Sequence, residues 1–276
     1  MTTTPIADPT NFPFLVTKEY RRFAEFCDAC RRFRYIGLCY GPPGVGKTLS
    51  ARHYARWALV EESDHLDRRW KRHVLAPLDV ALLECRTLIY TPPVSNTPRI
   101  IQQAVENLRD TLQHIQFHVF QQEGMNDQDD LEPELVIVDE ADRLKLPGLE
   151  QLRDMYDRGR LGGLVLIGMP GIEKRLARYA QLYSRVGFVH PYRPLGKEEL
   201  QFVLEQRWQD LGLRMDPGDF TDAEAIAAVI RITSGNFRLL QRLFSQIERI
   251  LEINGLRLIT KEVVEAARES LVIGVG

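Results

Sequence analysis

The sequence predicts an α/β domain at residues 17–193 and a small helical domain at residues 194–276, after an N-terminal arm at residues 1–16. In the first domain, short apolar runs alternate with segments of helical spacing, which is typical of a parallel sheet with helical crossovers. From about Pro194 onward the apolar spacing is helical throughout, so a separate all-helical domain is expected to follow.

The composition is that of an ordinary globular protein, with 276 residues of which 44% are hydrophobic and 27% are charged. The formal net charge is −2, so any surface for nucleic acid has to be local. The sequence has neither a recognisable signal peptide nor an apolar run long enough to cross a membrane. We therefore expect a cytoplasmic protein without a membrane partner.

The first helix is predicted from Lys18 to about Phe33, because apolar residues recur at three- and four-residue steps from Tyr20 onward and Thr17 can cap it. Two of the four cysteines, Cys27 and Cys30, fall in this helix at the spacing of half a zinc site. No second pair of Cys or His lies at a matching spacing, which favours two thiols on one helix face over a metal site.

A glycine-rich loop follows the first expected strand, whose residues are Tyr35–Tyr40. The loop fits the pattern G-x-x-x-x-G-K-[ST] at every fixed position, and a helix is expected after it from Leu49 to Val60. In this strand–loop–helix context the pattern indicates a nucleoside triphosphate site rather than an ordinary turn. The residues expected to bind the nucleotide are Gly41, Pro42, Pro43, Gly44, Val45, Gly46, Lys47, Thr48 and Leu49.

The residue types of this loop indicate how it would hold phosphate. Glycines let successive backbone N–H groups turn toward phosphate oxygens, and the new helix adds its positive N-terminal end. Lys47 would reach the β- and γ-phosphates, and the Thr48 hydroxyl would ligate Mg²⁺. The sequence therefore predicts that the chain binds ATP and magnesium.

Two polar insertions interrupt the first domain, at Glu61–Ala76 and Gln121–Pro133. The first mixes basic residues, one Trp and several acids, and we favour a self-paired surface helix over a nucleic-acid contact. Between the insertions we expect a second buried strand at Val80–Tyr90, a stiff loop with three prolines, and a helix from about Arg99 to Ile115. The second insertion is acidic and is expected to be an exposed, mobile loop.

A second motif lies at Leu135–Asp142. Four apolar residues predict a buried strand, and acids follow where that strand ends, at the edge of an open α/β sheet where ligands bind. Asp139 is expected to hold the Mg²⁺ shell, and Glu140 to orient and deprotonate the attacking water. Together with the phosphate loop, these two acids predict ATP hydrolysis.

The remaining elements complete the two domains. A helix is expected at Leu149–Arg160, a buried strand at Leu164–Gly168, a helix at Ile172–Leu182 and an apolar segment at Tyr183–Val189. The helices expected in the second domain are Lys197–Leu211, Asp222–Thr233, Phe237–Asn254 and Thr260–Leu271. Gly235 and Gly255 lie between consecutive helices of this set and are expected to end them.

With both motifs and a helical C-terminal domain, the chain resembles the AAA+ ATPases over roughly residues 15–272. The resemblance implies a parallel sheet of order 5-1-4-3-2, a helical lid over the nucleotide, and assembly into a ring or helical filament. Arg185 stands where the family carries an arginine finger, which acts on the nucleotide of a neighbouring subunit. Gly235–Arg238 resembles the sensor-2 motif, whose arginine, here Arg238, closes the lid onto the γ-phosphate. For each arginine the alternative is a surface or structural ion pair.

One position departs from the family pattern. The residue after the fourth strand is usually Asn, Thr or Ser in the family, and here it is Met169, which cannot orient a water by hydrogen bonding. Either the register is shifted by a few residues or hydrolysis is slow, which would suit a switch better than a motor.

Among AAA+ proteins, the run Val138–Leu144 and the strand end Ile167–Gly168 are similar to transposon-encoded regulators of the TnsC, TniB and MuB type, with the IstB group more distant. The resemblance implies ATP-dependent assembly on duplex DNA, marking of a target, and partnership with a transposase and target-selection proteins. Thr91–Arg99 sits where those proteins carry a DNA-facing loop, which makes Arg99 the candidate phosphate contact. The alternative for Arg99 is an ion pair with Glu106 or Asp110 on the same helix.

Two other function classes remain open on the sequence. One is a replication-type initiator or loader, and the other is a secretion-associated or regulatory ATPase that acts on protein without DNA. DNA-stimulated ATPase activity separates the DNA-binding classes from the last one. Stimulation of a transposase separates the transposition regulator from the loader.

Overall fold

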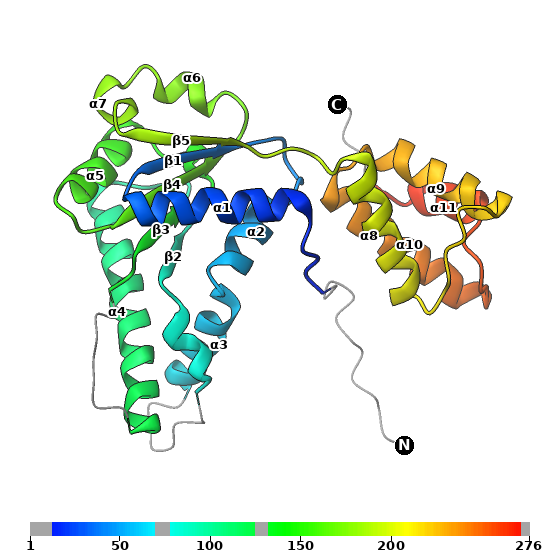
Figure 1. The fold of residues 1–276 in the computed structure, drawn as a ribbon, viewed down its shortest axis with the longest axis horizontal. Coiled ribbons are helices and arrows are strands. Elements are labelled where there is room, and N and C mark those ends of the chain that lie inside the picture. The colour runs from blue at the N-terminus through cyan, green and yellow to red at the C-terminus, as the bar shows by residue number, and fades with distance from the viewer. Residues whose placement is uncertain (1–12, 70–77, 125–131, 272–276) are drawn as a thin grey trace. The chain divides into compact units, whose positions relative to one another are not determined.

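The computed structural model describes residues 13–69, 78–124 and 132–271, and its contacts divide the chain into two compact units. The sheet unit consists of Tyr20–Gly41 and Lys47–Tyr192. The helical unit consists of Arg193 and the residues after it, together with Pro42–Gly46 and the described residues up to Glu19. Figure 1 shows the sheet and its helices in blue to yellow-green, and the part of the helical unit that follows Arg193 in yellow to red.

A five-stranded sheet forms the centre of the sheet unit. Its strands are β1 (Ile36–Tyr40), β2 (Thr87–Tyr90), β3 (Leu135–Val138), β4 (Gly163–Gly168) and β5 (Val186–Pro191). All neighbours are parallel, and the order β2-β3-β4-β1-β5 confirms the order that the resemblance implied. Strands β2, β3 and β4 are buried at every position, which explains why they are continuous apolar runs in the sequence.

One helix of the sheet unit precedes β1, and the others lie between the strands. They are α1 (Lys18–Phe33), α2 (Lys47–Tyr54), α3 (Trp57–Arg69), α4 (Pro98–Glu123), α5 (Leu146–Asp157), α6 (Ile172–Leu176) and α7 (Ala180–Tyr183), with short 3₁₀ turns η1 (Val80–Glu84) and η2 (Ala141–Arg143). Figure 1 shows α1 lying against the sheet. Its bounds agree with the predicted Lys18–Phe33 helix.

The contact between α1 and the sheet depends on a glycine. A Cβ placed on Gly37 of β1 would lie 2.4 Å from the Cys30 sulfur and 2.6 Å from the ring of Phe26, so only glycine lets the helix come this close. Cys27 and Cys30 are both fully buried in this contact. Burial raises the pKa of the Cys30 thiol to about 12, so these cysteines act as small core side chains rather than as reactive thiols.

Several predicted elements have the wrong extent. The expected strand Val80–Tyr90 is a strand only from Thr87 onward, because Asp79 caps η1 by accepting a hydrogen bond from the Ala81 N–H at 2.8 Å. The expected helix Leu49–Val60 is broken into α2 and α3 at Arg56, whose φ is +50°.

Helix α4 is longer than predicted, and a later helix is divided in two. Helix α4 runs to Glu123 and ends at Gly124 in the left-handed conformation, so the start of the expected acidic loop is helical. The rest of that loop at residues 125–131, and residues 70–77 of the first insertion, lie outside the described residues. The expected helix Ile172–Leu182 is two short helices, α6 and α7.

The helical unit packs four helices around its own core. They are α8 (Lys197–Asp210), α9 (Phe220–Thr233), α10 (Phe237–Asn254) and α11 (Lys261–Glu269), close to the predicted ranges. The rings of Trp208 and Phe244 meet edge to face in this core, with centroids 5.5 Å apart. Gly255 ends α10 with a φ of +61°, as its position in the sequence predicted. Across the described parts of both units, no helix is long and apolar enough to cross a membrane.

Candidate nucleotide site

The phosphate loop runs from the end of β1 into α2. Two of its glycines have positive φ, +78° at Gly44 and +108° at Gly46. This backbone conformation is strained for most residues other than glycine. The Lys47 ammonium donates a hydrogen bond to the carbonyl oxygen of Gly41 at 2.6 Å. The loop therefore has the curled backbone and the cation at its base that phosphate binding requires.

The two sequence motifs meet at one pair of side chains. The Thr48 hydroxyl donates to Asp139 Oδ2 at 2.7 Å, although the two residues are 91 positions apart in the chain. The other carboxylate oxygen of Asp139 accepts the backbone N–H of Glu140 at 2.9 Å. Asp139 is only 5% exposed. A buried carboxylate beside a hydroxyl is a donor set of hard oxygens, which is the kind that magnesium prefers.

Glu140 is held in an unusual conformation directly after β3. Its φ of +52° and ψ of +41° are left-handed, which a non-glycine residue adopts at a cost of roughly 1–2 kcal/mol. Its carboxylate forms an ion pair with Arg143, and the same guanidinium donates to the carbonyl oxygen of Pro92 at 3.0 Å. Arg143 thus links the loop before Arg99 to Glu140, the candidate base. Nothing in the sequence signalled this double contact of Arg143.

The residue after β4 is Met169, as the sequence indicated. Its side chain is 39% exposed, and its backbone N–H donates to Asp142 Oδ2 at 2.7 Å. Arg175 fixes the same turn by donating to the carbonyl oxygens of Asp142 at 2.9 Å and Ala141 at 3.2 Å. The polar group at this strand end is therefore the carboxylate of Asp142, which comes from the motif after β3.

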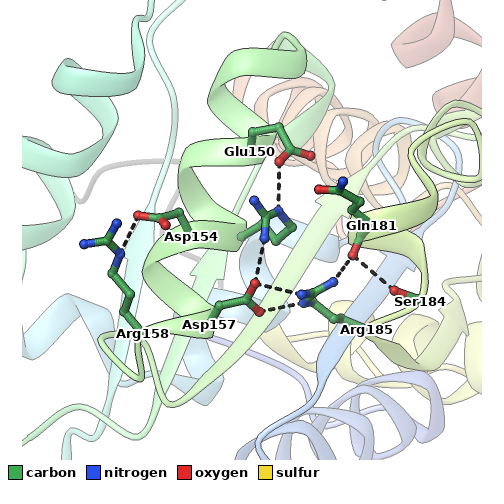
Figure 2. A network of polar contacts seen from close by, with 8 residues as sticks. Glu150, Asp154, Asp157, Arg158, Gln181, Ser184 and Arg185 are labelled. Carbon is green, nitrogen blue, oxygen red and sulfur yellow. Dashed lines mark hydrogen bonds and ion pairs between the residues drawn. The ribbon is translucent and has the colours of Figure 1, made fainter.

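Arg185 is engaged in the ion pair that the sequence left open as an alternative. Its Nε donates to Asp157 Oδ1 at 2.5 Å and its Nη2 donates to Asp157 Oδ2 at 2.8 Å (Figure 2). Asp157 is the last residue of α5, and Arg185 immediately precedes β5. The side chain of Arg185 is 33% exposed, so its guanidinium still reaches the surface.

The Gly235–Arg238 segment contacts the phosphate loop within the helical unit. Asn236 caps α10, and its side-chain amide donates to the carbonyl oxygen of Pro43 at 2.9 Å. The backbone N–H of Arg238 donates to the carbonyl oxygen of Gly44 at 2.9 Å. The Arg238 side chain is exposed and forms no ion pair with any residue that the structure describes.

Arg99 is exposed in the first turn of α4, where Thr97 caps the helix. One of its suggested partners, Glu106, pairs instead with Arg160 at 3.3 Å and accepts a hydrogen bond from Gln102 at 2.9 Å. Within residues 13–69, 78–124 and 132–271, Arg99 forms no ion pair. The preceding loop exposes 84% of Val94.

Comparisons with known proteins agree with this geometry. The profile of a family described as an AAA domain matches residues 31–176. A potential ATP-binding protein of Staphylococcus aureus is 47% identical over 270 residues, which are 96% of this chain and 98% of that protein. The Thermotoga maritima RuvB Holliday junction branch migration motor superposes with a TM-score of 0.59 at 16% identity, covering 94% of this chain and 70% of that one, which shows a shared fold.

A further relative is the ATP-dependent target DNA activator B of Escherichia phage Mu. It is 29% identical over 177 residues, which are 60% of this chain and 45% of the activator, so the match spans less than half of the phage protein. The family match covers both nucleotide motifs, whose side chains the fold brings together. The chain therefore belongs to the AAA domain family and is an AAA+ ATP hydrolase that resembles regulators of the activator B type.

Proposed function

We propose that this ATPase binds duplex DNA in its ATP state, assembles on it as a ring or helical filament, marks it as a target, and activates a transposase. The observation that carries the proposal is the link that Arg143 makes between the loop before Arg99 and the candidate catalytic base. Arg143 pairs with Glu140 and also donates to Pro92 in that loop. The similarity to a phage protein named for ATP and target DNA supports the transposition branch.

The nucleotide chemistry follows from the residues at the ends of β1 and β3. Lys47 would hold the β- and γ-phosphates, and Thr48 and Asp139 would hold magnesium, whose charge when bound offsets that of the phosphates. Glu140 would take a proton from the attacking water. Arg238 would contact the γ-phosphate, and Arg185 of a neighbouring copy would complete the site, so that the active form is a homo-oligomer.

The DNA surface has to come from assembly, because the chain has a net charge of −2. One exposed Arg99 per copy would line a spiral along a DNA strand in a ring or filament. Contacts to phosphate carry no base information, so binding should be independent of sequence and should weaken steeply with salt.

The test is duplex binding with a slowly hydrolysed ATP analogue across a salt series, for wild type and Arg99→Ala. Each arginine–phosphate pair removed from the assembly should reduce the log–log salt slope by about 0.9. Arg268→Ala is the matched control, since it also removes an exposed arginine, from α11. An unchanged slope in Arg99→Ala would remove Arg99 from the DNA path. Failure of wild type to bind duplex with any nucleotide would overturn the proposed function.

A second measurement separates the remaining function classes. DNA strand transfer by a transposase should increase when the ATP-bound protein is present. Duplex binding without that increase would indicate a replication-type loader instead. ATPase activity that responds to a protein partner and never to DNA would indicate a regulatory ATPase that acts on protein.

A further inference from the structure

The guanidinium of Arg185 is clamped from the side by one carboxylate. Nε and Nη2 donate to the two oxygens of Asp157 at 2.5 and 2.8 Å, and Nη1 donates to the carbonyl oxygen of Gln181 (Figure 2). Paired contacts of this kind between arginine and a carboxylate are the most directional of the charge-assisted hydrogen bonds. The orientation of this half-buried side chain is therefore fixed within its own subunit.

Asp157 is itself fixed from the other direction. Arg153 Nη1 donates to Asp157 Oδ2 at 2.7 Å, and Arg153 Nε donates to Glu150 at 2.8 Å. The hydrogen bond from Arg185 and the charges of both arginines lower the pKa of Asp157, so its carboxylate is ionised at neutral pH. Charges of alternating sign thus run from Glu150 to Arg185. Each is only 21–34% exposed, which protects the pairs from solvent more than isolated surface pairs.

The side-on clamp leaves the far end of the guanidinium available. Arginine has five N–H donors, of which Nε, one on Nη2 and one on Nη1 are used here. Among the residues that the structure describes, one N–H on each terminal nitrogen has no acceptor. Two such donors form the fork that matches two oxygens of a phosphate. Asp157 therefore binds the Nε side of the guanidinium and leaves the end with the two terminal nitrogens for a phosphate.

We propose that Asp157 is a positioning residue for ATP hydrolysis, which holds Arg185 side-on so that its terminal N–H groups are aimed at the nucleotide of a neighbouring copy. The inference rests on the proposed role of Arg185. It follows from the general requirement that a group acting on a transition state be oriented before the reaction, because a misplacement of about 1 Å can cost about 10²-fold in rate.

The same helix supplies a matched control. Asp154 is also in α5 and forms an ion pair with Arg158 at 2.9 Å, and Figure 2 shows that pair beside the network. Asp154→Asn removes the same charge and also breaks an arginine pair, but it leaves the contacts of Arg185 in place. A difference between Asp157→Asn and Asp154→Asn therefore reports the clamp and not the charge of the helix.

The first experiment measures ATPase kinetics of the full chain. Asp157→Asn should lower kcat by about 10- to 100-fold with KM within about twofold, because only the transition state loses an interaction. Asp154→Asn should stay within about twofold of wild type in both. Asp157→Glu, which keeps a carboxylate, should recover part of the loss. Nucleotide affinity measured on the same samples should be unchanged, and this shows that the variants are folded.

The second experiment mixes subunits. Asp157→Asn subunits keep Glu140 but have a loose Arg185, whereas Glu140→Gln subunits keep the clamp but lack the base. In a mixed assembly, a clamped Arg185 from a Glu140→Gln subunit can act on the intact site of an Asp157→Asn subunit. If Arg185 acts across an interface, the mixture should hydrolyse ATP faster than the sum of the two proteins alone. A variant that had merely lost its fold would not be rescued in this way.

Three outcomes would count against the proposal, and they are distinguishable. Wild-type kcat in Asp157→Asn, with Arg185→Ala inactive, would overturn the positioning role alone. A rise in kcat would mean that Asp157 restrains Arg185 rather than aiming it, which would also overturn the proposal. Full activity of Arg185→Ala would overturn the proposed role of Arg185, and the inference with it.

Discussion

Two regions of the sheet unit carry charged groups, and they are arranged in opposite ways. Near the ends of β1 and β3, the buried carboxylate of Asp139 accepts hydrogen bonds from a threonine hydroxyl and a backbone N–H. Both donors are neutral, so the negative charge of Asp139 favours the binding of a cation. Where the end of α5 meets the residue before β5, Asp157 and Arg185 belong to a network whose charges balance within the chain. On the proposed function, the first region (Lys47, Thr48, Asp139 and Glu140) is a receiving region for a charged ligand, and the second (Asp157 and Arg185) is a presenting region for a neighbouring copy. We infer that one copy supplies the first and its neighbour the second.

The largest expected effect comes from the receiving region. Lys47→Ala should abolish nucleotide binding, because the β- and γ-phosphates lose their main side-chain cation. Equilibrium binding of a fluorescent ATP analogue measures this directly. Retained binding at the wild-type affinity would show that the curled backbone of the loop holds the nucleotide without the lysine.

The next effect comes from the presenting region. Arg185→Ala should leave nucleotide binding intact but reduce turnover by about 10³–10⁵-fold, as expected when an arginine finger is removed. Steady-state ATPase assays at saturating ATP test this. Loss of binding along with turnover would instead indicate that the ion pair with Asp157 is needed for the fold.

A smaller loss of rate is expected at the base. Glu140→Gln should keep nucleotide binding and slow hydrolysis by about 10²–10⁴-fold, since only water activation is removed. Single-turnover hydrolysis separates this step from product release. A wild-type rate in this variant would mean that another group takes the proton.

The smallest effect concerns stability and its dependence on pH. The pKa of Asp157 is lowered mainly by its hydrogen bond from Arg185, so the folded-state pKa lies below the unfolded one. The pair therefore stabilises the fold above the unfolded pKa of about 4, and this contribution is lost as the pH falls through the lowered pKa. Asp157→Asn should reduce the free energy of unfolding at pH 7 by at most about 1 kcal/mol. Urea unfolding should show that difference at pH 7 and not at the acid end, and an equal difference at both would contradict it.

The sequence was enough to predict that the residues of the receiving region come together, because they lie in two short motifs. Gly41–Thr48 and Asp139–Glu140 each follow an apolar strand, and parallel strands bring their carboxyl ends to one edge. The presenting region was only half visible. Arg185 was found by resemblance, but Asp157 lies 28 residues away with no motif around it. Only the packing of α5 against α7, the helix just before Arg185, brings the two together.

Local misjudgements have similar physical causes. The strand expected from Val80 begins late because Asp79 offers its carboxylate as a helix cap, and a cap competes with a strand for the same residues. Arg56 breaks a helix by adopting a positive φ, for which a non-glycine residue gives no signal in the sequence. Arg143 contacts Glu140 and Pro92 at once, a link that depends on β2 and β3 being neighbours.

The division of the site between copies is tested most directly by the ATPase activity per subunit of the wild-type protein, measured over a wide range of protein concentration. If Arg185 of one copy completes the site of another, dilute protein should be nearly inactive, and activity per subunit should rise with concentration until assembly is complete. Arg185→Ala should stay low throughout that range. Activity per subunit that does not change with concentration would contradict a site shared between copies.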